Sequence, residues 1–213
     1  MTPTRSAVGE RRSAVALRSG AEALRRDGYC HLPDLWPAGL VDDLARDAAE
    51  HAPSARRRPD DWDSRPDKDY WQWHDNAVGF GPILAAVFAD AELLSLVRAL
   101  TGRLVVPTIY TYLYYRCGEG APIHVDRSEV DFSLFTHVSG DLGPLVIHPD
   151  LAGHAGACLD AIAEETGGQP KGGVPVIYPP SGATLLDGRK MPHRRPPSEH
   201  PGVACVITYK VRF

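Results

Sequence analysis

The chain has 213 residues, of which 43% are hydrophobic and 23% are charged, and its formal net charge is -4 with histidine neutral. This length favours a single domain over residues 1–213, the acidic balance argues against a nucleic-acid partner, and no apolar run reaches the roughly 18 residues of a membrane span. The four cysteines form no CxxC pair, which argues against a disulfide framework and a cysteine-based zinc site. Because no signal-peptide pattern follows Met1, we expect a cytoplasmic protein.

Helical periodicity dominates the first 102 residues. The pattern predicts helices over residues 12–26, from near Pro37 and over residues 80–100, and a short strand over residues 28–33. Asp90 is a suitable N-cap within the third of these helical segments, because its carboxylate can accept a hydrogen bond from a backbone N–H of the first turn. Each helix has one apolar face, so we expect residues 1–102 to form a helical support packed against another layer.

An aromatic cluster ends the long stretch of residues 52–76, which is otherwise dense in proline, aspartate and arginine. Its members include Trp71, Trp73 and His74. Large aromatic side chains in a loop are seldom all left in water, because they bury a large apolar area on contact with the core. Two interpretations follow: the cluster closes one edge of the core, or Trp73 or His74 lines a substrate pocket.

The second half of the chain, residues 103–213, has the pattern of an all-β structure. Short runs rich in β-branched and aromatic residues are separated by glycine, proline and aspartate. The runs cover residues 104–116, 123–125, 132–138, 145–148, 174–178, 183–186 and 203–213. One insertion, residues 149–173, interrupts them and contains a predicted short helix over residues 158–166. The spacing favours a sandwich, barrel or jelly roll as the fold class, mainly β with N-terminal helices.

The strongest chemical signal is the motif His124-Val125-Asp126, which is followed much later by His193. Residues i and i+2 of a strand point to the same face, so His124 and Asp126 can bind one ion together. Two histidines and one carboxylate form the facial triad of non-haem Fe(II) oxygenases, with open positions for substrate and O2. An HxD motif alone is weak evidence, and a core histidine bonded to a carbonyl is the plain alternative.

Three stretches in order resemble the Fe(II)/2-oxoglutarate-dependent dioxygenases, in particular the phytanoyl-CoA and prolyl hydroxylase-like branches. Residues 24–34 are similar to the family's N-terminal segment, residues 115–126 to the approach to the first two metal ligands, and residues 182–193 to the approach to the third. The resemblance implies a double-stranded β-helix, or jelly roll, braced by helices. It also implies that His124, Asp126 and His193 bind Fe(II), and that 2-oxoglutarate and O2 are co-substrates.

The family pattern fails at the position expected to hold 2-oxoglutarate. Enzymes of this family commonly place a basic residue, usually arginine, on the C-terminal strand to bind the far carboxylate, and here Ala204 stands in its place. Strand alternation puts Lys210 on the same face as Ala204, so we prefer Lys210 together with Tyr112 as the carboxylate ligands. Other candidates are Arg116, on the strand before the HxD motif, and Arg194 or Arg195, beside the third metal ligand.

The carboxylate at position 126 also bears on the reaction. Similar enzymes that halogenate have glycine or alanine there, so Asp126 favours hydroxylation, desaturation, epoxidation or ring formation. Candidate substrate contacts are Trp73, His74 and Arg127, and the small chain favours a small organic molecule such as an amino acid or a secondary metabolite. Two alternatives stay open: a jelly-roll metalloenzyme that does not use 2-oxoglutarate, and a non-enzymatic binding module. The sequence predicts no oligomeric state.

Overall fold

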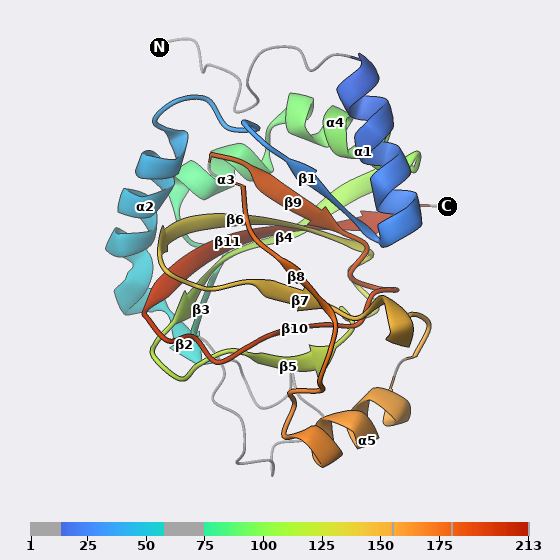
Figure 1. The fold of residues 1–213 in the computed structure, drawn as a ribbon. Coiled ribbons are helices and arrows are strands. Elements are labelled where there is room, and N and C mark those ends of the chain that lie inside the picture. Colours follow the sequence, from blue (N-terminus) through green and yellow to red (C-terminus); the bar gives the residue numbers. More distant parts are fainter. Residues whose placement is uncertain (1–13, 58–74, 155, 180, 213) are drawn as a thin grey trace, which may run out of the picture.

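The computed structural model describes residues 14–57, 75–154, 156–179 and 181–212. Within these ranges two sheets face each other, one with the strand order β1-β9-β6-β11-β4-β3-β2 and one with the order β5-β10-β7-β8 (Figure 1). The strands are β1 (Tyr29–Leu32), β2 (Arg56–Arg57), β3 (Asp75–Val78), β4 (Val105–Tyr115), β5 (Ala121–His124), β6 (Phe132–Gly140), β7 (Leu145–Ile147), β8 (Val174–Val176), β9 (Ala183–Leu186), β10 (His193–Arg195) and β11 (Gly202–Val211). The helices are α1 (Ala14–Asp27), α2 (Leu40–His51), α3 (Pro82–Phe88), α4 (Ala91–Thr101) and α5 (Ala157–Thr166).

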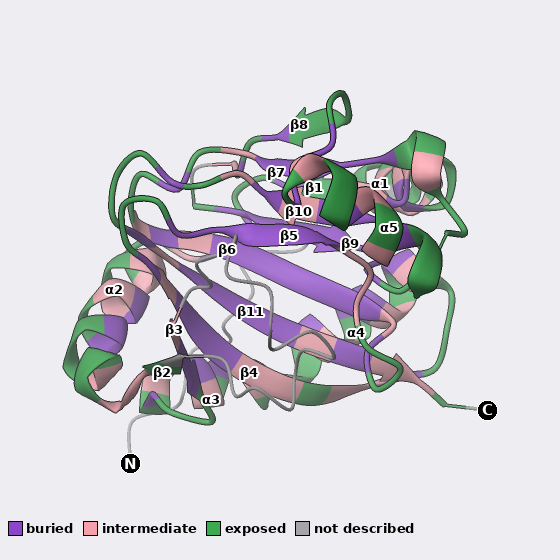
Figure 2. Cartoon of the chain, turned by 90° about the horizontal axis from the view of Figure 1, so that it is seen from below, coloured by how far each residue is buried: buried purple, intermediate pink, exposed green. Residues whose placement is uncertain are grey.

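The larger sheet is buried on both faces, and the C-terminal strand β11 shows why. Cys205 and Ile207 pack in the core shared with the N-terminal helices, whereas Ala204 and Val206 pack in the core between the two sheets. Successive side chains of a strand point to opposite faces, so an almost continuous apolar run fits a strand that is covered on both sides. Figure 2 shows the central strands β6 and β11 as largely buried.

Four helices cover the outer face of the larger sheet, as the apolar faces in the sequence predict. The predicted third helix is divided into α3 and α4, because the backbone of Asp90 leaves the helical conformation, with φ -70° and ψ 119°. Its carboxylate accepts a hydrogen bond from Leu93 N at 2.8 Å, which confirms the predicted N-cap. Among the described helices none is long and apolar enough to cross a membrane.

The first 102 residues are not only a helical support. β1 pairs with β9 at one edge of the larger sheet, and β3 pairs with β4 and β2 at the other. Strand β3 lies at the end of the region predicted to be a loop, and its short sequence, Asp-Asn-Ala-Val, has too little apolar alternation to indicate a strand. The larger sheet therefore contains more strands from the first 102 residues than the sequence pattern predicts.

The insertion packs on the smaller sheet and contains the predicted helix. Leu159 and Ala163 of α5 form a small buried cluster with Ile123 of β5, the strand that leads to the HxD motif. Gly168, just after α5, accepts a hydrogen bond from Ile123 N at 3.2 Å. The insertion therefore supports the back of a strand that carries a candidate metal ligand.

Candidate metal centre

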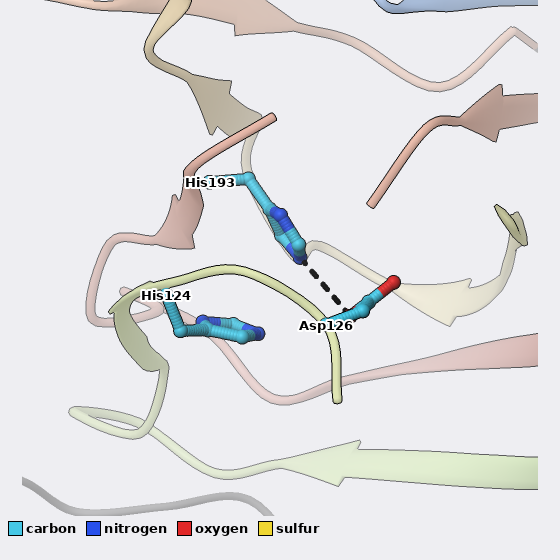
Figure 3. Close-up of side chains that lie close together, drawn as sticks. All are labelled: His124, Asp126 and His193. Carbon is cyan, nitrogen blue, oxygen red and sulfur yellow. Dashed lines mark ion pairs between the residues drawn. The ribbon is translucent and has the colours of Figure 1, made fainter. Parts of the chain in front are cut away.

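The three predicted metal ligands lie together between the two sheets. His124 is the last residue of β5, Asp126 follows two residues later, and His193 begins β10. β5 and β10 are antiparallel neighbours in which His193 stands directly opposite His124, and the two imidazole centroids are 4.4 Å apart. One ligand atom from each of the three side chains lies within 4.8 Å of the other two, and the side chains point toward one another (Figure 3).

Backbone carbonyls orient both imidazole rings. Nδ1 of His124 is 2.7 Å from the carbonyl oxygen of Pro122, and Nδ1 of His193 is 2.9 Å from that of Met191. Because a carbonyl oxygen only accepts hydrogen bonds, each Nδ1 carries a hydrogen, which leaves Nε2 as the nitrogen of each ring that can bind a metal. This arrangement fixes the tautomer that a metal-binding histidine needs.

Asp126 is held by three further contacts. Its Oδ2 accepts a hydrogen bond from Ser133 Oγ at 2.6 Å, and its backbone N donates to Gly188 O at 2.7 Å. The Arg189 guanidinium donates to the Asp126 carbonyl oxygen at 3.1 Å. The other carboxylate oxygen, Oδ1, lies 3.7 Å from Nε2 of His193. Two oriented imidazoles and one carboxylate oxygen form a donor set that suits a divalent transition metal.

A cavity of about 140 Å³ opens beside the three side chains. Toward one end of β4 its wall includes Thr111 and, from neighbouring strands, Asn76 and Thr208. Toward the other end it includes Tyr115 and Arg195. The candidate metal ligands therefore open onto a space with uncharged hydrogen-bonding groups on one side and a cation on the other.

Arg195 is the cation of this cavity, and it is 1% exposed. Its guanidinium carbon lies 4.9 Å from the ring centroid of Tyr115 and 5.2 Å from that of Tyr178. It donates hydrogen bonds to the Tyr178 hydroxyl and to the carbonyl oxygens of Leu142 and Gly143, at 3.2 and 3.3 Å. Its Nε is buried without a hydrogen-bond partner among the described residues. Burial opposes the charge, but the two tyrosines outweigh it and raise the pKa, so the side chain is a buried cation.

The other basic candidates lie elsewhere. Lys210 donates to Ser128 O at 2.7 Å and pairs with Asp131 at 3.1 Å, so it fastens the loop after the HxD motif and does not line the cavity. Arg116 is 68% exposed in its side chain and pairs with Asp75 at 2.6 Å. Arg194 points to the opposite face of β10 from Arg195 and donates to Nε2 of His148 at 3.2 Å.

The predicted substrate residues are only partly described. Arg127 is exposed and lies 3.8 Å from the carboxylate of Glu129, outside the residues that line the cavity. Trp73 and His74 lie outside the described residues. The residues that sequence reasoning missed are Asn76, Thr111, Ser133, Tyr178, Gly188 and Thr208. Asn76, Thr111, Ser133 and Thr208 lie on strands and line the cavity, and strand alternation alone could not indicate which side of each strand faces it. Tyr178 and Gly188 lie outside the strands and contact Arg195 and Asp126, which no local pattern indicates.

Tyr112 lies on the face of β4 opposite the cavity. Its side chain is fully buried against the N-terminal helices, and its hydroxyl donates to Oδ2 of the buried Asp47 at 2.7 Å. Burial, together with this carboxylate, raises the pKa of Tyr112, so the hydroxyl keeps its proton. The same carboxylate oxygen accepts from Leu84 N at 3.2 Å, so Tyr112 joins β4 to α2 and α3 and does not support co-substrate binding.

Replacing Tyr112 with phenylalanine should therefore affect stability and not ligand binding. The Asp47 carboxylate would lose a donor while staying buried, which is expected to lower the free energy of unfolding by about 1–3 kcal/mol. Urea denaturation of the variant and the wild type measures this difference. A weaker affinity for 2-oxoglutarate with unchanged stability would contradict the structural role of Tyr112.

Comparison with known proteins adds information on the fold. No family model matches the sequence, and no curated protein matches it. Among solved structures, the non-heme alpha ketoglutarate dependent epimerase SnoN from nogalamycin biosynthesis matches with a TM-score of 0.68 and 15% identity, over 93% of this chain and 84% of that chain. A Pseudomonas putida prolyl-4-hydroxylase matches with a TM-score of 0.64 and 14% identity, over 92% of this chain and 100% of that chain.

A third similar structure is HygX from Streptomyces hygroscopicus, solved with nickel, 2-oxoglutarate and hygromycin B bound. It matches with a TM-score of 0.63 and 14% identity, over 92% of this chain and 88% of that chain. At such identities the likeness establishes the fold. The chain has the jelly roll of the Fe(II)/2-oxoglutarate-dependent oxygenases, which confirms the predicted fold class.

Proposed function

We propose that this protein is a non-haem Fe(II)/2-oxoglutarate-dependent oxygenase that oxidises a small organic molecule. The observation that carries the proposal is the position of the His124, Asp126 and His193 cluster, which opens onto a cavity that contains the buried cation Arg195. The fold shared with SnoN, the prolyl-4-hydroxylase and HygX supports it.

The three clustered side chains would hold Fe(II) through Nε2 of His124, Nε2 of His193 and one oxygen of Asp126. Two imidazoles and one carboxylate leave part of the coordination sphere open for co-substrates. The bound iron, together with 2-oxoglutarate and O2, supplies the oxidising chemistry. The protein would orient both imidazoles through hydrogen bonds from Nδ1 to backbone carbonyl oxygens, so that Nε2 of each ring is directed to the metal.

Arg195 would bind the far carboxylate of 2-oxoglutarate. Residues i and i+2 of a strand share a face and lie about 6.6 Å apart, a separation comparable with the length of a short dicarboxylate. His193 and Arg195 have this relation on β10, and both line the cavity. A guanidinium can make two charge-assisted hydrogen bonds to one carboxylate. Ala204, which packs in the same cluster as Tyr115 and Tyr178, leaves the role to Arg195.

The substrate would bind against the uncharged polar wall of the cavity. Asn76, Thr111 and Thr208 offer amide and hydroxyl groups there. The exposed Arg127, one residue after Asp126, stays a candidate substrate contact outside the cavity lining. The comparison with HygX, which was solved with hygromycin B, supports a secondary metabolite as the substrate class. The carboxylate at Asp126 supports hydroxylation or a related oxidation in preference to halogenation.

Ala204 favours one alternative, a jelly-roll metalloenzyme that does not use 2-oxoglutarate. Anaerobic titration with Fe(II), followed by addition of 2-oxoglutarate, separates the two functions. We expect metal binding and then a weak visible metal-to-ligand charge-transfer band, and in air a slow release of succinate. Metal binding without that band would support the alternative, and an absence of metal binding would contradict both.

A further inference from the structure

We propose that Ser133 and Gly188 are positioning residues that restrict Asp126 to one metal-binding oxygen. The inference rests on the metal site proposed above, and it concerns residues that contact Asp126 and not the metal. The two residues come from different parts of the fold: Ser133 lies on β6 of the larger sheet, and Gly188 lies in the segment between β9 and β10. Both act on the same carboxylate oxygen, Oδ2.

Ser133 occupies this oxygen by donating a hydrogen bond. The Ser133 hydroxyl donates to Oδ2 of Asp126 at 2.6 Å. Ser133 is 2% exposed and belongs to a strand that is paired on both sides, so its side chain has little freedom to move away. A hydrogen bond to a charged acceptor is among the stronger ones in proteins.

Gly188 confines the same oxygen by having no side chain. A Cβ placed on Gly188 would overlap Asp126 Oδ2 and would lie 2.6 Å from the carboxylate carbon. Gly188 is not among the glycines with positive φ, so space and not backbone conformation explains why a glycine fits here. Its carbonyl oxygen also accepts the hydrogen bond from Asp126 N at 2.7 Å, which keeps the two segments in contact.

With Oδ2 confined in this way, Oδ1 is the oxygen that faces the histidines, 3.7 Å from Nε2 of His193. Binding through one oxygen makes three protein donors in total. A six-coordinate ion then keeps three positions for co-substrates, whereas a carboxylate that used both oxygens would take one of them. Ser133 and Gly188 would thus preserve an open position on the metal.

The test is the affinity for Co(II), measured by competition with a chelating dye, together with the visible absorption spectrum of the bound Co(II). Residues that orient metal ligands typically contribute about 10–100-fold to metal affinity. We expect a loss of about 10-fold for Ser133→Ala and about 100-fold for Gly188→Ala, within that range. The Co(II) spectrum of Ser133→Ala should also change, because its intensity and position report the coordination number. Ser133→Thr keeps the hydroxyl and should retain most of the affinity.

Gly20→Ala is the matched control for Gly188→Ala. It introduces the same methyl group in α1, against the flexible tip of Leu100 and away from the metal site, so Co(II) affinity should not change. Wild-type affinity and an unchanged spectrum in a folded Ser133→Ala variant would overturn the role of Ser133. Wild-type affinity in Gly188→Ala would overturn the role of Gly188. If that variant does not fold, the Co(II) affinity and spectrum of Ser133→Ala decide whether confinement of Oδ2 matters for metal binding.

These outcomes differ from failure of the proposed function. If the wild type does not bind Co(II), the metal site and this inference fall together. If the wild type binds Co(II) but does not respond to 2-oxoglutarate, only the proposed co-substrate is wrong. The ratio of variant to wild-type metal affinity still tests Ser133 and Gly188 in that case.

Discussion

Replacing His193 with alanine is expected to lower Fe(II) or Co(II) affinity by more than about 100-fold, because loss of a ligand should exceed the effect of losing a residue that only orients one. His193 contributes the only imidazole from β10, and its ring faces both His124 and Asp126. Metal-dependent turnover should be abolished. The side chain borders an existing cavity, so the variant should remain folded by circular dichroism.

His137→Ala is the control for this experiment. His137 is partly buried on β6, and its Nε2 is 3.1 Å from the Ser139 carbonyl oxygen. It is not part of the cluster of possible metal ligands. Metal affinity should therefore match the wild type. A His193→Ala variant that still binds the metal tightly would show that the assigned ligand is wrong.

Replacing Arg195 with methionine should remove binding of 2-oxoglutarate while leaving metal binding intact. Loss of one partner of a buried, hydrogen-bonded charge pair costs about 2–5 kcal/mol, which corresponds to a loss of affinity of at least about 30-fold. Arg195→Lys keeps the charge but cannot make the bidentate hydrogen bonds of a guanidinium, so its affinity for 2-oxoglutarate should lie between those of Arg195→Met and the wild type. Titration of the anaerobic Fe(II) protein with 2-oxoglutarate measures each affinity.

Lys210→Met and Arg116→Met are the controls for Arg195. Each removes a cation that is paired with an aspartate outside the cavity, so the affinity for 2-oxoglutarate should stay close to the wild-type value. A loss of affinity in Lys210→Met, with no loss in Arg195→Met, would reverse the assignment. Thermal unfolding should accompany the measurements, because Tyr178 and two carbonyl oxygens lose a hydrogen-bond donor in Arg195→Met.

Much of the candidate metal centre could be predicted because it depends on local geometry. The i, i+2 relation of His124 and Asp126 follows from the period of a strand, and the structure brings both side chains together. His193 depended on the resemblance to a family, since a residue distant in sequence meets the motif only through the pairing of β10 with β5. Periodicity alone does not encode that pairing.

Which basic residue lines the cavity could not be predicted from the sequence. Alternation predicts Lys210 on the same side of β11 as Ala204, but it could not show that Lys210, near the end of the strand, pairs with Asp131 and does not line the cavity. The prediction that Tyr112 binds the 2-oxoglutarate carboxylate met a related difficulty. Register pairs Leu113 with Ala204, so Leu113 faces the smaller sheet and Tyr112 faces the helices. Which alternate residues face inward depends on this register, which the sequence does not reveal.

Strand β10 has only three residues, yet it carries a candidate metal ligand at one end and the buried cation at the other. If Arg195 binds the far carboxylate as proposed, its distance from the metal ligand His193 is set by the covalent backbone of one strand, and it does not depend on the relative position of two separate strands. Inserting one residue between His193 and Arg195 would turn the guanidinium toward the opposite face of the sheet, so this short segment should tolerate no change in length.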